Sequence, residues 1–163
     1  MTQRRKARLR RVLTALLIAT LCFIWGNSLV GREGSSSLSQ TITPWLHSIG
    51  IPASEHFVRK AAHFCEFGLL GCELAGLSLL RGGLCFQSLC NSAFAALLTA
   101  VTDETIQIFT GRGPQVQDVV LDFSGAVTGI LGLSLLILLV QKARASRKAR
   151  APSLTGEQHN TGG

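Results

Sequence analysis

Two long stretches of this chain carry no charged residue, and their length limits the folds available to it. The first runs from Val12 to Gly31 and the second from Leu84 to Thr102. A helix needs about 20 predominantly apolar residues to cross the hydrocarbon layer of a membrane. Because 47% of the residues are hydrophobic and only 15% are charged, the composition indicates a membrane protein rather than a soluble globular one.

Two further apolar stretches complete the prediction of an all-α, polytopic bundle of four transmembrane helices. Ser54 is suited to cap the second helix, and Gly111, Gly113 and Pro114 indicate a tight connection before the fourth. The predicted spans are residues 12–31, 55–80, 84–108 and 116–140. The flanking segments are a basic tail, residues 1–11, and a second basic tail, residues 141–163, which is predicted to be disordered.

The positions of the basic residues predict how the bundle is oriented. Six of the 16 Lys and Arg residues lie in the opening run and five follow Gln141. Positive charge flanks the cytoplasmic ends of spans, so both termini are expected in the cytoplasm, with loops 31–58 and 109–117 on the other side. A cleavable signal peptide is the rival interpretation of residues 1–31. No convincing small-residue cleavage site follows, so a retained signal anchor is favoured.

The second predicted span contains ionisable residues at helical spacing. Lys60, His63 and Glu66 are three residues apart, and Glu73 follows Glu66 by seven, so one face of the helix carries them all. This face should contact protein rather than lipid. Glu73 lies about 20 Å along the axis from Lys60, and at that depth it should be either protonated or hydrogen-bonded to a neighbouring helix.

Polar residues from all four spans fall at the extracytoplasmic end of the predicted bundle. The densest stretch, Thr102 to Gly125, joins the third and fourth spans. The residues predicted to line a polar pocket at this end are Asn27, Ser28, Arg59, Lys60, His63, Glu66, Asp103, Glu104, Gln107, Arg112, Asp118 and Asp122. Asp118 and Asp122 have an alternative role, because carboxylates in the first turns of a helix interact favourably with its dipole.

Small residues in the spans have a structural interpretation. Gly125 and Gly129 form a small-xxx-small pair that would allow another helix to approach closely. The five cysteines lie in apolar runs and show neither metal-ligand spacing nor a disulfide framework, so they are interpreted as small core residues. With one His among oxygen ligands and no zinc spacing, no metal or cofactor is predicted.

Three motifs, in order, resemble the VanZ-like family of small bacterial membrane proteins. They are FVRKAAHFCEFGLLG (57–71), TDETIQIFTGR (102–112) and QDVVLDFSGAVTGILG (117–132), preceded by GNSL (26–29). The resemblance implies a multi-pass protein of the bacterial cytoplasmic membrane, from a family associated with low-level resistance to teicoplanin and without a settled molecular activity. Many relatives have His in place of Ile106 and Pro in place of Thr110, so a mechanism that needs that His cannot operate here.

Three classes of function remain open. A binding or shielding protein would hold a lipid headgroup, a lipid-linked envelope intermediate or the lipoglycopeptide itself, with cations meeting anions and carboxylates meeting amines. An enzyme would use His63 with Glu66 and Glu104 or Asp103 for acid/base or metal-assisted chemistry on an amphiphilic substrate. A small proton-coupled transporter would depend on Glu73. Membrane lipids are the expected surroundings, nucleic acid is not an expected partner, and the oligomeric state is open.

Overall fold

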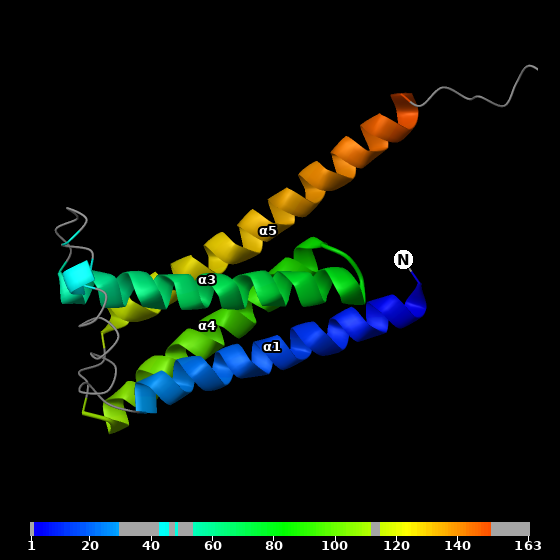
Figure 1. The fold of residues 1–163 in the computed structure, drawn as a ribbon. Coiled ribbons are helices and arrows are strands. Elements are labelled where there is room, and N and C mark those ends of the chain that lie inside the picture. Colours follow the sequence, from blue (N-terminus) through cyan, green and yellow to red (C-terminus); the bar gives the residue numbers. More distant parts are fainter. Residues whose placement is uncertain (1, 30–42, 46–47, 49–53, 112–114, 151–163) are drawn as a thin grey trace, which may run out of the picture.

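The computed structural model describes residues 2–29, 43–45, 48, 54–111 and 115–150. Its long elements are helices α1 (Gln3–Leu29), α3 (Glu55–Arg81), α4 (Phe86–Phe109) and α5 (Val116–Arg150). Successive helices alternate in direction, so the start of α1 and the end of α5 lie at the same end of the bundle (Figure 1). The predicted all-α fold is confirmed for the part of the chain described.

Three of the four helices, α1, α3 and α5, are long and apolar enough to cross a membrane. The helix outside this group, α4, carries Gln87, Asn91, Asp103 and Glu104 along its 24 residues. Large apolar side chains point outward on α5, and Leu135, Leu136, Leu138 and Leu139 are each more than half exposed. An apolar surface of this kind suits contact with lipid and not with water. The chain is therefore an all-helical protein with membrane-type helices.

Local sequence signals explain where α3 begins and ends. The Ser54 side chain accepts a hydrogen bond from the Phe57 backbone N–H at 3.2 Å, as expected of an N-cap. At the other end Gly82 follows the last helical residue, and Gly83 has φ of +97°, a conformation that glycine adopts without steric cost. This turn reverses the chain between α3 and α4.

The two basic segments continue the helices. α1 already begins at Gln3, within the basic segment 1–11, and α5 continues through Lys142 to Arg150. The prediction of a disordered tail from residue 141 is therefore wrong as far as Arg150. Ala, Arg and Lys have high helix propensity, and extending an existing helix avoids the cost of nucleating a new one. The rest of the predicted tail lies outside the described residues.

The core lies where all four helices meet. It is small and aliphatic apart from one aromatic ring, and its buried members are Ile24, Phe67, Leu70, Ala96, Ala100 and Ala126. Leu17, Leu21, Trp25, Leu74 and Val119 pack around it, partly buried. The alanines on α4 and α5 allow these helices to come close to α3, which contacts every other helix of the bundle.

Glycines make the contact between α3 and α5 the closest in the bundle. A methyl group added at Gly125 would collide with the Phe64 carbonyl, and one added at Gly129 would collide with the Gly68 carbonyl. Gly71 on α3 lies equally close to the backbone of Ala126. The predicted role of Gly125 and Gly129 is thereby confirmed, because the two backbones touch directly at these positions.

Hydrogen bonds link polar side chains of neighbouring helices in the apolar layer. The Thr20 hydroxyl of α1 donates to Glu73 Oε1 at 3.0 Å, and Glu73 is 5% exposed. Of the two alternatives for Glu73, the structure shows the hydrogen bond to a neighbouring helix. Further along α3, the hydroxyls of Ser78 and Ser92 lie 3.1 Å apart and link α3 to α4.

The backbone contact predicts that Gly129→Ala destabilises the bundle. A Cβ at this position meets carbonyl and amide atoms that cannot rotate away, so we expect a cost of about 1–3 kcal/mol. Gly132→Ala is the matched control, because an added Cβ there meets nothing within 4 Å, and the higher helix propensity of Ala should leave stability unchanged or slightly raised. Unfolding by SDS in mixed micelles, followed by circular dichroism, measures both. Equal stability of the two variants would contradict the close approach of α3 and α5.

Candidate functional site

Eight polar or ionisable side chains from all four helices converge at the end of the bundle opposite the chain's basic ends. α1 contributes Ser28, α3 contributes His63 and Glu66, α4 contributes Asp103, Glu104 and Gln107, and α5 contributes Asp118 and Asp122. We call these eight residues the end cluster. Ser28, Asp103, Glu104, Gln107 and Asp122 are each less than 9% exposed, so the cluster extends into the protein interior.

Asp103 accepts hydrogen bonds from two other members of the cluster. Its side chain is fully buried. Ser28 Oγ donates to Asp103 Oδ1 at 2.6 Å, and Gln107 Nε2 donates to Asp103 Oδ2 at 2.8 Å. Each carboxylate oxygen therefore accepts one hydrogen bond, which fixes the orientation of the group and ties α1 to α4. Hydrogen bonds to a buried charge are among the stronger ones in proteins.

His63, Asp103 and Asp122 meet in the interior of the cluster. One nitrogen of His63 and one oxygen of each carboxylate all lie within 4.8 Å of one another. Asp122 is only 1% exposed, and its Oδ1 has no hydrogen-bond partner in the described part of the chain. Each residue comes from a different helix, α3, α4 and α5, so the arrangement depends on how the three helices cross.

Glu66 adds a further carboxylate beside this group. It lies one helical turn beyond His63 on α3 and is repelled by the charge of Asp103. Its Oε2 is buried and, within the described residues, accepts no hydrogen bond. Asp122 is in turn repelled by Asp103, Glu104, Asp118 and Glu66. Carboxyl groups from α3, α4 and α5 therefore lie close together at this end of the bundle.

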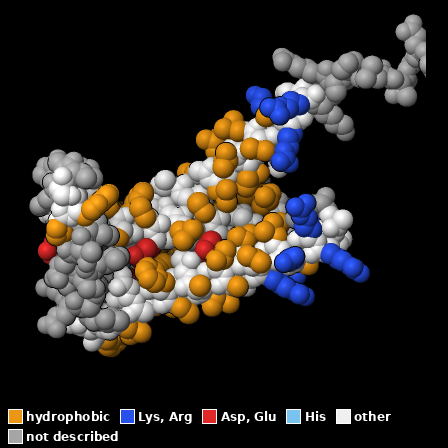
Figure 2. Space-filling view, viewed as in Figure 1, with side chains coloured by type: hydrophobic (Ala, Val, Ile, Leu, Met, Phe, Trp, Pro, Cys, Tyr) orange, Lys and Arg blue, Asp and Glu red, His pale blue; other side chains and the backbone are white. Residues whose placement is uncertain are grey.

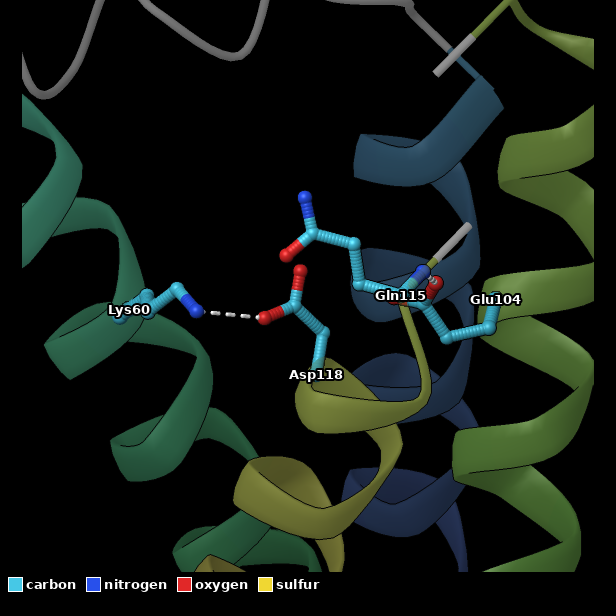
Figure 3. Close-up of polar contacts among 4 residues, drawn as sticks. All are labelled: Lys60, Glu104, Gln115 and Asp118. Carbon is cyan, nitrogen blue, oxygen red and sulfur yellow. Dashed lines mark hydrogen bonds and ion pairs between the residues drawn. The ribbon is translucent and has the colours of Figure 1, made fainter. Parts of the chain in front are cut away.

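An ion pair lies at the rim of the cluster. Lys60 Nζ lies 2.8 Å from Asp118 Oδ1, with both side chains roughly a quarter exposed (Figure 3). A pair with this much solvent contact contributes about 0–1 kcal/mol. Asp118 also lies in the first turn of α5, so the suggestion that it interacts with the helix dipole remains compatible with its position.

Glu104 supports the start of α5. Its Oε2 accepts a hydrogen bond from the backbone N–H of Gln115 at 3.1 Å (Figure 3). Gln115 directly precedes α5, where backbone N–H groups lack helical partners and favour a negative group. Sequence reasoning grouped Glu104 with His63 and Glu66 and missed this contact, because nothing in the sequence connects residue 104 with residue 115.

The remaining predicted residues lie outside the hydrogen-bonded cluster. Asn27 and Arg59 are partly buried, and neither side chain forms a hydrogen bond or ion pair with another described residue. Arg112 lies outside the described residues. Thr110 was not predicted as a site residue, yet its hydroxyl lies 3.2 Å from the carbonyl oxygens of both Ser28 and Gln107 and joins the ends of α1 and α4.

The charge balance of the end cluster determines what chemistry it suits. Among the described residues it holds five carboxylates together with His63, and Lys60 pairs with one of them at the rim; the carboxylates are Glu66, Asp103, Glu104, Asp118 and Asp122. Such an excess of buried acid is costly unless protons, a cation or an amine compensate for it. An imidazole among carboxylates also has the groups that acid/base chemistry requires.

The fold and the site together define a helical, membrane-type protein with ionisable groups buried at one end. The family model for VanZ/LLP1 matches residues 13–139. The chain therefore belongs to the VanZ/LLP1 family, as the motifs predicted. Comparison with curated proteins and with solved structures gave no match.

The contacts of Asp103 predict that Ser28→Ala destabilises the protein. The substitution removes one of two hydrogen bonds to a fully buried carboxylate, which should cost about 1–3 kcal/mol. Ser124→Ala is the matched control, because Ser124 is exposed and, among the described residues, its hydroxyl bonds to the Leu121 carbonyl of its own helix and to no other helix. SDS unfolding of both variants measures the difference. A loss for Ser28→Ala no larger than for Ser124→Ala would show that the bond to Asp103 is not stabilising.

Proposed function

We propose that this protein crosses the bacterial cytoplasmic membrane four times, with both termini in the cytoplasm, and that its end cluster binds an amphiphilic envelope component at the outer leaflet. α4 is the proposed fourth span, since 24 helical residues extend about 36 Å. Lys and Arg residues gather at the free ends of α1 and α5, whereas the acidic residues lie toward the other end (Figure 2). The positive-inside rule then assigns the acidic end to the outside.

The observation that supports binding is the burial of several ionisable groups from four helices at one level. Such groups are expensive inside a membrane protein and usually mark a functional site. Since the carboxylates outnumber Lys60 and Arg59, the favoured contact is with the cationic part of an amphiphile, such as an amine-bearing lipid headgroup. Lys60 and Arg59, nearer solvent, would meet an accompanying phosphate or carboxylate.

The envelope component that we propose is a lipid headgroup, a lipid-linked envelope intermediate or a lipoglycopeptide such as teicoplanin. Membership of the family supports this choice, because VanZ-like proteins are associated with teicoplanin resistance. Binding would shield the envelope from the drug or sequester the drug at the membrane surface. The protein would thereby protect the cell at a low level.

An enzymatic role is the second candidate, and one observation favours it. The His63 nitrogen lies within 4.8 Å of carboxylate oxygens of Asp103 and Asp122, so a base and two potential acids are close together. A proton-coupled transporter has less support, because Glu73, the residue it would need, is hydrogen-bonded to Thr20. That bond links Glu73 Oε1 to α1, and Glu73 Oε2 is buried without a hydrogen-bond partner among the described residues.

Drug tolerance tests the proposed function. In a teicoplanin-sensitive Gram-positive host, the wild-type chain should raise the tolerated teicoplanin concentration. His63→Ala, Glu66→Gln and Glu104→Gln should reduce that effect by graded amounts, because each removes an ionisable group of the end cluster. Glu55→Gln, at an exposed position of the same helix as Glu66, is the control and should behave as wild type.

All variants are compared at equal membrane abundance. Abolition by Glu66→Gln and Glu104→Gln, with no intermediate phenotype, would favour the enzyme over the binding protein. No protection by the wild-type chain would refute the proposed role in resistance.

The orientation predicts opposite labelling of the two ends of the bundle. Cys85 lies at the turn before α4 and is exposed, and Val116 at the start of α5 is 81% exposed. Two single-cysteine variants are compared, one that keeps Cys85 alone and one that carries Val116→Cys alone, with all other cysteines replaced by Ala. A membrane-impermeant maleimide added to intact cells should leave Cys85 unlabelled and should label Val116→Cys. The reverse pattern would invert the proposed topology, and labelling of both sites would refute the four-span arrangement.

A further inference from the structure

The interior of the end cluster contains more unsatisfied acid than the described chain compensates. Asp103 has one donor on each oxygen, from Ser28 and Gln107. Asp122 is 1% exposed, and its Oδ1 accepts no hydrogen bond within the described residues. A buried carboxylate oxygen without a partner is unfavourable, because it has lost its hydration and gained nothing in return. A positive ion held between Asp103 and Asp122 would remove that cost and their mutual repulsion.

We propose that His63, Asp103 and Asp122 bind a divalent transition metal ion, with Zn²⁺ as the best-suited ion. Their three ligand atoms lie within 4.8 Å of one another. In a tetrahedral site with metal–ligand distances near 2.1 Å, ligand atoms are about 3.4 Å apart. Side chains on three neighbouring helices therefore need to close by at most about 1.4 Å, which small torsional adjustments provide.

The donor set selects the class of ion. Mg²⁺ and Ca²⁺ prefer ligands that are all oxygen, whereas imidazole suits zinc and the other transition metals. One His nitrogen with two carboxylates resembles the mixed nitrogen and oxygen sets that hold Zn²⁺ with a fourth position left for water or substrate. Glu66, one turn from His63 on α3, is near enough to Asp103 and Asp122 for electrostatic repulsion.

The surroundings of Asp103 support this assignment. Metal-binding carboxylates are usually hydrogen-bonded by second residues that fix their orientation. Ser28 and Gln107 provide such bonds at 2.6 and 2.8 Å. Each oxygen of Asp103 retains a further lone pair for an ion. The rival explanation is that protons alone neutralise the cluster, with no metal bound.

This inference uses residues of the same end cluster as the proposed envelope function, but it can be tested separately from it. It concerns the ion alone, so its test needs neither drug nor lipid ligand. Tag-free, full-length protein in lipid nanodiscs is stripped with a chelator and titrated with Zn²⁺ against a competing chelating dye. The same preparation is measured for metal content after dialysis and by X-ray absorption at the zinc edge.

The wild-type protein is expected to bind one Zn²⁺ per chain, with nitrogen and oxygen ligands at about 2.0–2.2 Å and no sulfur at about 2.3 Å. His63→Ala and Asp122→Asn should each weaken Zn²⁺ binding by more than about 100-fold. Ser28→Ala, which removes a hydrogen bond to the ligand Asp103, should weaken it by roughly 10–100-fold. The matched controls are His56→Ala and Glu55→Gln, at exposed positions at the start of α3, and should bind as wild type. Mn²⁺ should bind more weakly than Zn²⁺.

Three results would overturn the proposal. They are Zn²⁺ binding below one ion per chain at saturation, affinities of His63→Ala and Asp122→Asn equal to wild type, or a zinc–sulfur distance that assigns the ion to a cysteine such as Cys65 or Cys72. Circular dichroism shows whether each variant is folded. If His63→Ala or Asp122→Asn is unfolded, the graded loss in Ser28→Ala and the absorption spectrum of the wild type decide the question.

Discussion

The burial of Asp103 is the constraint on which the outer half of this structure depends. A carboxylate with no solvent contact can persist in an apolar bundle only if other groups satisfy its oxygens. Ser28 of α1 and Gln107 of α4 do so, and Thr110 ties the same two helices together at the level of the Ser28 carbonyl. The position of α1 against α4 is therefore set by polar contacts, and Asp122 of α5 is then brought to the same place by close packing.

That close packing comes from the glycines of α3 and α5. Gly125 and Gly129 let the two backbones touch, and Asp122 lies one turn before Gly125 on the same helix. The close approach of α3 and α5 at these glycines therefore brings Asp122 near His63. A helix pair held apart by larger side chains would separate the imidazole from the carboxylate. In this bundle, helix packing and the composition of the end cluster depend on one another.

Much of the fold could be predicted from hydrophobic runs and helix-boundary residues. The predicted span of 55–80 corresponds to α3 at Glu55–Arg81, and that of 84–108 to α4 at Phe86–Phe109. The continuation of α5 to Arg150 was missed because a basic, polar segment was interpreted as a disordered tail. Lys, Arg and Ala favour the helical conformation, so this polar segment continues α5.

The site could be predicted less completely. Periodicity on α3 and the positions of the acids indicated that polar groups share one end of the bundle. The eight residues of the end cluster do lie there. The pairing of Ser28 with Asp103, and of Glu104 with Gln115, depends on helix crossing angles that a single sequence does not specify. The proximity of His63 to two carboxylates has the same origin, so the sequence carried no metal-ligand spacing by which to recognise it.

The central claim is that the end cluster is a binding site and not merely a set of structural hydrogen bonds. The most direct test is an experimental structure of the full chain in lipid nanodiscs, with the map inspected between His63, Asp103 and Asp122. The account predicts non-protein density in contact with the carboxylates of Asp103 and Asp122. Asp122 turned away to pair with a protein donor, with no density between the three side chains, would contradict it.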